Sequence, residues 1–239
     1  MDKLYIVIPA YNEEANIEAV VGQWYPIVQA AGPESRLLVV NDGSKDSTGQ
    51  KLEQLAARLP ALLPFTKENG GHGPACLFGY QKALEAGADY IFQTDSDGQT
   101  LPEEFAAFWE KREQYDMVIG HRAGRQDGFS RLVVTKVLKY VTLFFLKAPT
   151  TDPNTPFRLM KREFLEECLG LIPAGFNLPN VLIAAFGSRL KKRVLYLPVT
   201  FLPRQGGVNS INLKKITRIG LKALADFRAI DKALKAKGL

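Results

Sequence analysis

The 239-residue sequence contains only two cysteines, Cys76 and Cys168, which are too few and too far apart for a disulfide framework or a cysteine-rich metal site. This scarcity favours a reducing, cytoplasmic location. No segment approaches the ~18–20 apolar residues that a membrane-spanning helix needs, because residues 133–146 are interrupted by Lys136 and Lys139. The first residues lack the features of a signal peptide. No compositional bias matches collagen-like or disordered chains, and 46% hydrophobic residues suffice for a sizeable core.

Negative charge is scarce at one end of the chain. Residues 189–239 carry 13 Lys and Arg against 2 Asp and Glu, a net charge of +11, whereas residues 1–188 carry 18 against 23, a net charge of −5. A basic segment attached to an acidic body predicts a polyanionic partner such as anionic lipid, phosphate or nucleic acid. The alternative is an ordinary solvated helical face.

The first half of the chain alternates apolar strands with amphipathic helices. This alternation predicts an α/β fold, with a mostly parallel central sheet and helices on both of its faces. In such sheets, ligands bind outside the carboxyl ends of the strands. The predicted strands are residues 4–9, 37–41, 62–66, 90–94 and 117–120, and the predicted helices are residues 13–31, 46–59, 73–86 and 102–113.

The second half is less regular, and no repeat or clear linker divides it. We expect one domain over residues 1–210, followed by a basic amphipathic C-terminal helix within residues 211–239. A turn-rich loop with three prolines is expected over residues 148–156. The other expected elements are helices over residues 130–147, 162–169 and 212–237, a segment near 178–186, and a strand over 194–199.

Polar loops follow three of the predicted strands. Residues 9–14 (PAYNEE) can be an ordinary strand-to-helix turn. In residues 41–48 (NDGSKDST), the carboxylate of Asp42 can accept hydrogen bonds from a ribose or a base edge. The glycine-rich loop over residues 69–75 (NGGHGPA) can bring backbone N–H groups and a helix N-terminus to a phosphate. Its His72 is either a partly exposed loop residue or a contact to a diphosphate.

A fourth loop, residues 94–99 (TDSDGQ), carries two carboxylates at alternate positions directly after a buried strand. Placing Asp95 and Asp97 there is costly unless a cation neutralises them. Mg²⁺ is usually held by one or two carboxylates together with substrate phosphates. The loop therefore predicts a divalent cation that bridges a bound diphosphate.

Together with Asp152, Phe157-Arg158 and residues 204–210, these loops resemble the family-2 inverting glycosyltransferases. Within that family, the chain is similar to the branch of dolichol-phosphate mannose synthases and bacterial polyprenyl-phosphate glycosyltransferases. The resemblance implies a glycosyltransferase-A fold, a UDP- or GDP-linked sugar as donor, and Mg²⁺ or Mn²⁺. It implies donor-binding roles for Pro9, Tyr11, Glu13, Asp42, Gly70, Asp95 and Arg204, and metal ligation by Asp95, Asp97 and Gln99.

The chain departs from the family pattern in three respects. Asn41 stands where many members have Asp, and Gly98 stands where the polyprenyl branch often has Leu. The transmembrane helices that some relatives append are not seen in this sequence, which leaves the means of membrane attachment open.

The acceptor decides what further residues the reaction needs. A sugar hydroxyl requires a general base, for which Asp152 is the candidate. A phosphate monoester is mostly dianionic at neutral pH, with a second pKa near ~6, and needs cationic groups instead. In that case Asp152 can orient an arginine. The candidate cations are Arg122, Arg125, Arg131, Arg158 and Arg204, and the candidate catalytic residues are Asp97, Arg122, Arg131 and Asp152.

The sequence therefore predicts metal-dependent, inverting transfer of a glycosyl group from a nucleotide sugar to a polyprenyl phosphate, in cell-envelope glycan biosynthesis. The alternative is transfer to a saccharide or another soluble hydroxyl. A sugar-1-phosphate nucleotidylyltransferase would normally carry a glycine-rich basic loop where residues 10–13 read AYNE. A nucleotide-sugar binding protein without activity is disfavoured by the two aspartates, and nucleic-acid binding lacks a recognition motif.

The C-terminal residues suggest how such an enzyme reaches a lipid acceptor. An apolar stripe and flanking basic residues are typical of a helix that lies in the interface of an anionic membrane. We therefore expect peripheral association with the cytoplasmic face of the membrane, through this helix and the basic residues 189–193. Packing of the stripe on the catalytic domain is the alternative. The stripe consists of Ile216, Ile219, Ala223, Phe227, Ile230 and Leu234.

Overall fold

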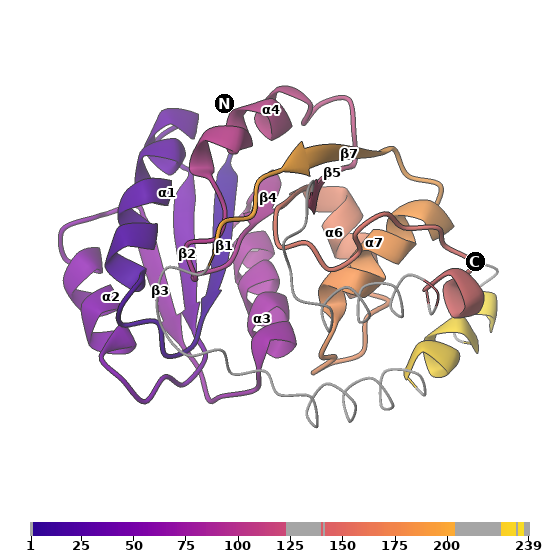
Figure 1. Cartoon of the computed structure of the whole chain (residues 1–239), viewed down its shortest axis with the longest axis horizontal. Coiled ribbons are helices and arrows are strands. Elements are labelled where there is room, and N and C mark those ends of the chain that lie inside the picture. The colour runs from indigo at the N-terminus through magenta and orange to yellow at the C-terminus, as the bar shows by residue number, and fades with distance from the viewer. Residues whose placement is uncertain (1, 123–139, 141, 204–225, 233, 237–239) are drawn as a thin grey trace.

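The computed structural model of the chain describes residues 2–122, 140, 142–203, 226–232 and 234–236. Within these residues, one seven-stranded sheet runs through the molecule with the strand order β3-β2-β1-β4-β6-β5-β7 (Figure 1). All neighbouring strands are parallel except at β6, which is antiparallel to both β4 and β5. The mostly parallel α/β architecture predicted from the sequence is therefore confirmed.

Most of the predicted elements are present, with small shifts at their ends. The strands are β1 (Leu4–Ala10), β2 (Arg36–Asn41), β3 (Leu62–Thr66), β4 (Tyr90–Gln93), β5 (Met117–Arg122), β6 (Arg158–Lys161) and β7 (Val194–Val199). The helices are α1 (Ile17–Ala31), α2 (Thr48–Ala56), α3 (His72–Glu85), the 3₁₀ turn η1 (Pro102–Glu104), α4 (Phe105–Glu110), α6 (Arg162–Leu169) and α7 (Pro179–Arg189).

Two hydrophobic layers cover the sheet, one on each face. Successive side chains of a strand point to opposite faces, so Ile6 of β1 packs in the layer with helices α1, α2 and α4, whereas Val7 packs in the layer with α3, α6 and α7. In the first layer, the ring of Phe92 lies 4.7 Å from Phe157 and 4.9 Å from Phe105, measured between centroids. Burial on both faces explains why β1 is apolar along its whole length.

Strand β6 was not predicted. Its four residues, Arg158–Lys161, are too short for a clear alternation and begin and end with a cation. They nevertheless lie in the middle of the sheet, where Arg158 is fully buried. Its guanidinium donates hydrogen bonds to the backbone oxygens of Thr155 (2.6 Å), Asn180 (2.8 Å) and Pro153 (3.1 Å). The interpretation of Arg158 as a phosphate-binding cation is therefore wrong, because the fold itself uses its donors.

The C-terminal stripe packs on the domain wherever the structure describes it. Phe227, Ile230 and Leu234 are buried in the same layer as α3 and α7, and Phe227 lies 6.0 Å from the ring of Phe176. The expectation that these three residues insert into a membrane is therefore wrong. The proposed boundary at residue 210 and the start of the stripe lie outside the described residues. Among the described helices, none combines the length and the apolar character required to cross a membrane.

Gly79 lets α3 approach the sheet closely, and its substitution tests this packing. A Cβ at Gly79 would lie 2.4 Å from Cγ1 of Val7 and 3.1 Å from Cγ2 of Val40. We expect Gly79→Ala to lower the free energy of unfolding by about 1–3 kcal/mol, measured by urea denaturation, because the core has no room for a methyl group. Gly22→Ala in α1 is the matched control, since nothing lies within 4 Å of its Cβ, and it should gain about 0.5–1 kcal/mol. Equal stabilities of the two variants would contradict the close approach.

Candidate active site

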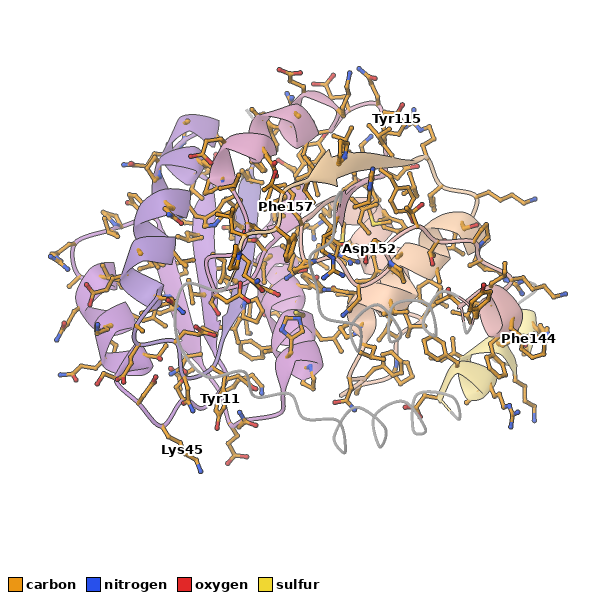
Figure 2. The ribbon with its side chains drawn as sticks, viewed as in Figure 1. Tyr11, Lys45, Tyr115, Phe144, Asp152 and Phe157 are labelled. Atoms are coloured by element: carbon orange, nitrogen blue, oxygen red, sulfur yellow. The ribbon has the colours of Figure 1, made fainter. Side chains whose placement is uncertain are left out.

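The polar loops predicted to carry chemistry meet at one edge of the sheet. Strands β1, β2, β3 and β4 are parallel neighbours, so their carboxyl ends lie side by side. The side chains of Tyr11 and Lys45, from the loops after β1 and β2, lie at this end of the molecule (Figure 2). This edge is therefore the candidate active site.

The loops after β1 and β2 are bonded to each other. The backbone N–H of Asn12 donates to Oγ of Ser44 (3.0 Å), and the Asn12 side-chain oxygen accepts from the N–H of Lys45 (2.8 Å). The N–H of Glu13 donates to Oγ1 of Thr48 (2.9 Å) at the start of α2. Hydrogen bonds in both directions make the two loops one unit, which supports the left-handed backbone of Asn12 (φ 54°).

The three donor-binding residues predicted in the first loop differ in their exposure to solvent. Pro9 is buried within β1, and Glu13 is buried with its carboxylate accepting a hydrogen bond from Nδ2 of Asn16 (2.8 Å). Tyr11 is partly exposed just after the strand. Tyr11 is the most exposed of the three, and donor contact by Pro9, Tyr11 and Glu13 stays a prediction.

Asp42 holds the glycine-rich loop in place. Its buried carboxylate accepts hydrogen bonds from Nζ of Lys67 (2.6 Å) and from the backbone N–H groups of Gly70 (3.0 Å) and Gly71 (2.7 Å). The adjoining Gly43 has a φ of +67°, and a Cβ there would lie 2.7 Å from the backbone nitrogen of Asn69. Both carboxylate oxygens thus engage the protein's own donors, and direct contact of Asp42 with a nucleoside stays a prediction.

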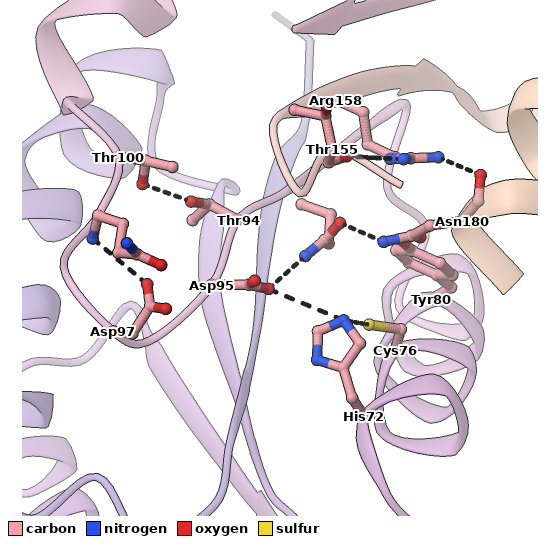
Figure 3. A network of polar contacts seen from close by, with 12 residues as sticks. His72, Cys76, Tyr80, Thr94, Asp95, Asp97, Thr100, Thr155, Arg158 and Asn180 are labelled. Atoms are coloured by element: carbon pink, nitrogen blue, oxygen red, sulfur yellow. Dashed lines mark hydrogen bonds and ion pairs between the residues drawn. The ribbon is translucent and has the colours of Figure 1, made fainter. Parts of the chain in front are cut away.

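Asp95 and Asp97 follow β4, as the sequence predicts. Oδ1 of Asp95 accepts a hydrogen bond from Nε2 of Gln93 (3.0 Å) and lies 3.9 Å from Nε2 of His72 (Figure 3). Oδ1 of Asp97 accepts from the backbone N–H of Gln99 (3.3 Å). Burial, together with the nearby Asp97 carboxylate, raises the pKa of Asp95 to about 6, although His72 and the Gln93 amide act in the opposite direction.

This donor set fits a divalent cation shared with a ligand. A carboxyl group whose pKa is raised by burial and by a second carboxylate lacks sufficient positive charge around it. In the part of the chain that the structure describes, no group of three or more His, Cys, Asp or Glu side chains forms a metal site by itself. Two carboxylates completed by phosphate oxygens and water match the coordination that Mg²⁺ prefers.

His72 begins α3 and stands beside this pair of carboxylates. Its side chain is about half exposed, and its Nε2 lies 3.5 Å from Sγ of Cys76. Cys76, followed by Asp95 and Asp97, raises the pKa of His72 above its ordinary value. A protonated imidazole at the N-terminus of a helix favours bound anions. The expectation that His72 contacts a diphosphate is consistent with this position and stays a prediction.

The loop that carries the two aspartates is fastened to the chain after β7. Oγ1 of Thr94 and Oγ1 of Thr100 are 2.8 Å apart, which closes the loop on itself. Gln99 donates from Nε2 to the backbone oxygen of Leu202 (2.7 Å), and the N–H of Leu202 donates to the backbone oxygen of Gln99 (2.8 Å). The fold therefore uses the Gln99 amide nitrogen, and metal ligation by this residue stays a prediction.

Arg122 and Asp152 form a partly buried ion pair that is held by two hydrogen bonds. Nε and Nη2 of Arg122 donate to Oδ2 (2.8 Å) and Oδ1 (2.9 Å) of Asp152. The Arg122 guanidinium also lies 5.1 Å from the ring centroid of Phe201, and it is close enough to the aspartate pair to act on the pKa of Asp95. Of the two roles considered for Asp152, the structure supports the orientation of an arginine. Because both of its oxygens accept from Arg122, Asp152 is poorly suited to act as a general base.

Arg125, Arg131 and Arg204 fall outside the described residues.

Two contacts at this site were not predicted from the sequence. Lys67 donates a hydrogen bond to Asp42, and Gln93 donates one to Asp95. Gln93, a polar residue within an otherwise apolar strand, was the available signal for the contact to Asp95.

Comparison with known proteins identifies chains similar to this one. The family model described as "Glycosyl transferase family 2" matches residues 5–169. A polyprenol monophosphomannose synthase from Mycolicibacterium smegmatis is 27% identical over 243 residues, covering 98% of this chain and 90% of the relative. An undecaprenyl-phosphate mannosyltransferase from Micrococcus luteus is 30% identical over 240 residues, covering 92% of this chain and 95% of the relative.

The fold is also found among solved structures. The glucosyl-3-phosphoglycerate synthase of Mycobacterium tuberculosis, crystallised with Mn²⁺ and UDP-glucose, superposes with a TM-score of 0.66 at 20% sequence identity. The match covers 97% of this chain and 79% of that one. At this level of identity, the likeness concerns the fold.

Proposed function

Because the chain belongs to glycosyl transferase family 2 and has the glycosyltransferase-A fold, we propose that this enzyme transfers a glycosyl group from a nucleotide sugar to a polyprenyl phosphate. The relatives from Mycolicibacterium and Micrococcus are named for polyprenol and undecaprenyl-phosphate chemistry and align with nearly the whole chain. The observation that carries the proposal is the oriented guanidinium of Arg122, which is held by Asp152 and whose charge acts on Asp95.

The donor, a UDP- or GDP-linked sugar, is assigned to the edge formed by the first four loops. The N-terminus of α3 and His72 present N–H groups and positive charge to the donor diphosphate, while the N–H groups of Gly70 and Gly71 bind the glycine-rich loop to Asp42. Asp95 and Asp97, with Gln99, hold Mg²⁺ or Mn²⁺, which when bound neutralises charge on the leaving diphosphate. The fold neighbour from Mycobacterium tuberculosis, crystallised with Mn²⁺ and UDP-glucose, supports this assignment.

The acceptor phosphate is assigned to Arg122, with Arg131 as a second cation. A phosphate oxygen already carries negative charge and attacks the anomeric carbon from the face opposite the diphosphate, with inversion, so no general base is required. A hydroxyl acceptor would need a carboxylate to remove its proton. Asp152 is engaged by Arg122 through both oxygens, and this favours the phosphate acceptor over the hydroxyl alternative.

A surface beside the C-terminal residues fits peripheral binding to a membrane, for which we propose the cytoplasmic face. Tyr140, Leu143 and Phe144 are 68%, 47% and 79% exposed, and their spacing places them on one helix face. Arg228 lies 5.4 Å from the ring of the neighbouring Phe145, which brings the C-terminal cations next to this apolar surface. Figure 2 shows Phe144 at the rim of the molecule. Apolar side chains flanked by cations favour anionic lipid surfaces.

The aspartates provide the first test of this function. We expect Asp97→Ala to lower kcat by at least about 100-fold at saturating donor, and Asp95→Ala to do nearly the same, because a charge-neutralising site is lost. Melting temperatures should stay near that of the wild type. Glu103→Ala, which removes an exposed carboxylate from η1, is the control and should keep full activity. Substantial turnover by either aspartate variant would refute the metal assignment.

Arg122 separates acceptor binding from donor binding. We expect Arg122→Gln to reduce transfer to polyprenyl phosphate far more than hydrolysis of the donor by water. Asp152→Asn should act in the same direction, and the double variant should be no worse than Arg122→Gln, because the two residues act as a unit.

A matched control is Arg112→Gln. Like Arg122, Arg112 pairs with a carboxylate, Asp2 (2.8 Å), and its guanidinium lies 4.5 Å from an aromatic ring, that of Trp109. Arg112 differs in its position, because it lies shortly after α4. It should leave both reactions unchanged. Equal losses of transfer and hydrolysis in Arg122→Gln would assign this arginine to the donor or to the fold.

Vesicle binding tests the proposed membrane surface. Sedimentation with vesicles should increase with anionic lipid and decrease with salt. The Leu143→Ser and Phe144→Ser double variant should bind less, because apolar area is lost from the surface. Changing Lys232 and Lys235 to Glu should weaken binding further. Ile27→Ser, in the apolar groove between α1 and α4, is the control. If vesicle binding is the same in all of these variants, the proposed membrane surface is wrong.

A further inference from the structure

A chain of hydrogen bonds runs through the core to Asp95. The hydroxyl of Tyr80 on α3 donates to Oδ1 of Asn180 on α7 (2.8 Å). Nδ2 of Asn180 donates to Oε1 of Gln93 on β4 (2.9 Å), and Nε2 of Gln93 donates to Oδ1 of Asp95 (3.0 Å). Three separate elements of the fold thus contribute one side chain each, and the chain ends on a carboxylate of the candidate active site (Figure 3).

The three supporting side chains are buried in an otherwise hydrophobic layer. Tyr80 and Gln93 have no exposed surface, and Asn180 is 2% exposed. Their neighbours in that layer include Val7, Ile91 and Val181. Burying polar groups is costly unless every one is bonded, so an apolar core would serve stability at least as well. Stability alone therefore does not explain these buried polar side chains, and their effect on Asp95 is the better explanation.

The direction of the bonds is the same at every step. An ionised carboxylate only accepts hydrogen bonds, so the amide of Gln93 must present its nitrogen to Asp95 and its oxygen to Asn180. Asn180 must then present its nitrogen to Gln93 and its oxygen to the hydroxyl of Tyr80. All donors point toward Asp95, and in a low-dielectric interior such chains strengthen one another.

Arg158 fixes the middle of this chain. Its Nη1 donates to the backbone oxygen of Asn180 (2.8 Å), and its other bonds hold Thr155 and Pro153. Asn180 therefore has its backbone bonded to β6 while its side chain links α3 to β4. This explains why a fully buried arginine stands in the centre of the sheet.

We propose that Tyr80, Asn180 and Gln93 are positioning residues that hold Asp95 in one orientation, as an anionic ligand for a divalent cation. The inference rests on the proposed function, because that function places the cation at Asp95 and Asp97. Partners that orient metal ligands typically contribute 10–100-fold to metal affinity. None of the three positioning residues touches the cation or the substrates.

The test is the affinity for Mn²⁺, measured by electron paramagnetic resonance titration of the whole chain, with and without UDP or GDP. We expect Gln93→Leu to weaken Mn²⁺ binding by about 10–100-fold, and Tyr80→Phe to weaken it by a smaller factor. In the transfer assay, both variants should need more Mn²⁺ for half-maximal rate and should recover most of kcat when Mn²⁺ is saturating. A purely structural role would not produce that separation.

Ser35→Ala is the matched control. Ser35 is also buried, and its Oγ accepts a hydrogen bond from the backbone N–H of Leu4 (3.0 Å) at the opposite end of the sheet. It should leave Mn²⁺ affinity unchanged. If Gln93→Leu does not fold, Tyr80→Phe decides, because it removes a single oxygen. Folded variants with wild-type Mn²⁺ affinity would overturn the inference.

The proposed function can fail separately. If the wild type binds Mn²⁺ and Gln93→Leu weakens that binding, the inference is supported. If the same wild-type protein does not glycosylate polyprenyl phosphate, the acceptor assignment is refuted. A wild-type protein that transfers sugar without binding Mn²⁺ would overturn the inference and retain the transferase.

Discussion

Carboxylates at one edge of the sheet need neutralising groups, and three of them, Asp42, Asp152 and Asp95, are neutralised by the chain to different degrees. Asp42 accepts hydrogen bonds from Lys67 and from two backbone N–H groups, and Asp152 accepts two from Arg122. Asp95 has an uncharged amide at 3.0 Å and a histidine only at 3.9 Å, and its pKa is raised. The first two carboxylates are used to fix loops and an arginine. The third retains a demand for positive charge, which is the property expected of a metal ligand.

The arrangement of strands makes this contrast possible. Since β1 lies between β2 and β4 in a parallel sheet, the loops after all three strands open at one edge. Short loops then lead directly into helices, and the start of α3 lies beside Asp95. Hydrogen bonds join the first two loops to each other and Asp42 to the glycine-rich loop. The fold thus places Asp95, whose pKa is raised by burial and by Asp97, among loops that are bonded to one another.

Local sequence patterns were sufficient to predict the elements that depend mainly on residues close together in the chain. Strand β7 and helix α6 were predicted with their observed bounds, because their periodicity and flanking residues specify them. Strand β6 was missed because its place in the sheet depends on pairing with β4 and β5, which are distant in sequence. Arg158 was misassigned for the same reason, since the carbonyl groups that satisfy it converge only in the folded chain. Likewise, an apolar stripe does not reveal whether it meets lipid or, as Phe227 does, the core.

The Arg122–Asp152 pair makes the two acceptor chemistries mutually exclusive under the proposed function. A hydroxyl acceptor would need Asp152 to release at least one oxygen from Arg122 in order to take up a proton, and the guanidinium would then lose its fixed orientation. A phosphate acceptor leaves the pair intact, because it brings its own negative charge and is attracted to the guanidinium while Asp152 keeps that group oriented. Selectivity against water and free sugars would follow from the same cause, since a neutral hydroxyl is attracted less strongly to an oriented cation and Asp152 is engaged by Arg122. A change of acceptor class would therefore require a new carboxylate near the donor, with Arg122 and Asp152 altered together.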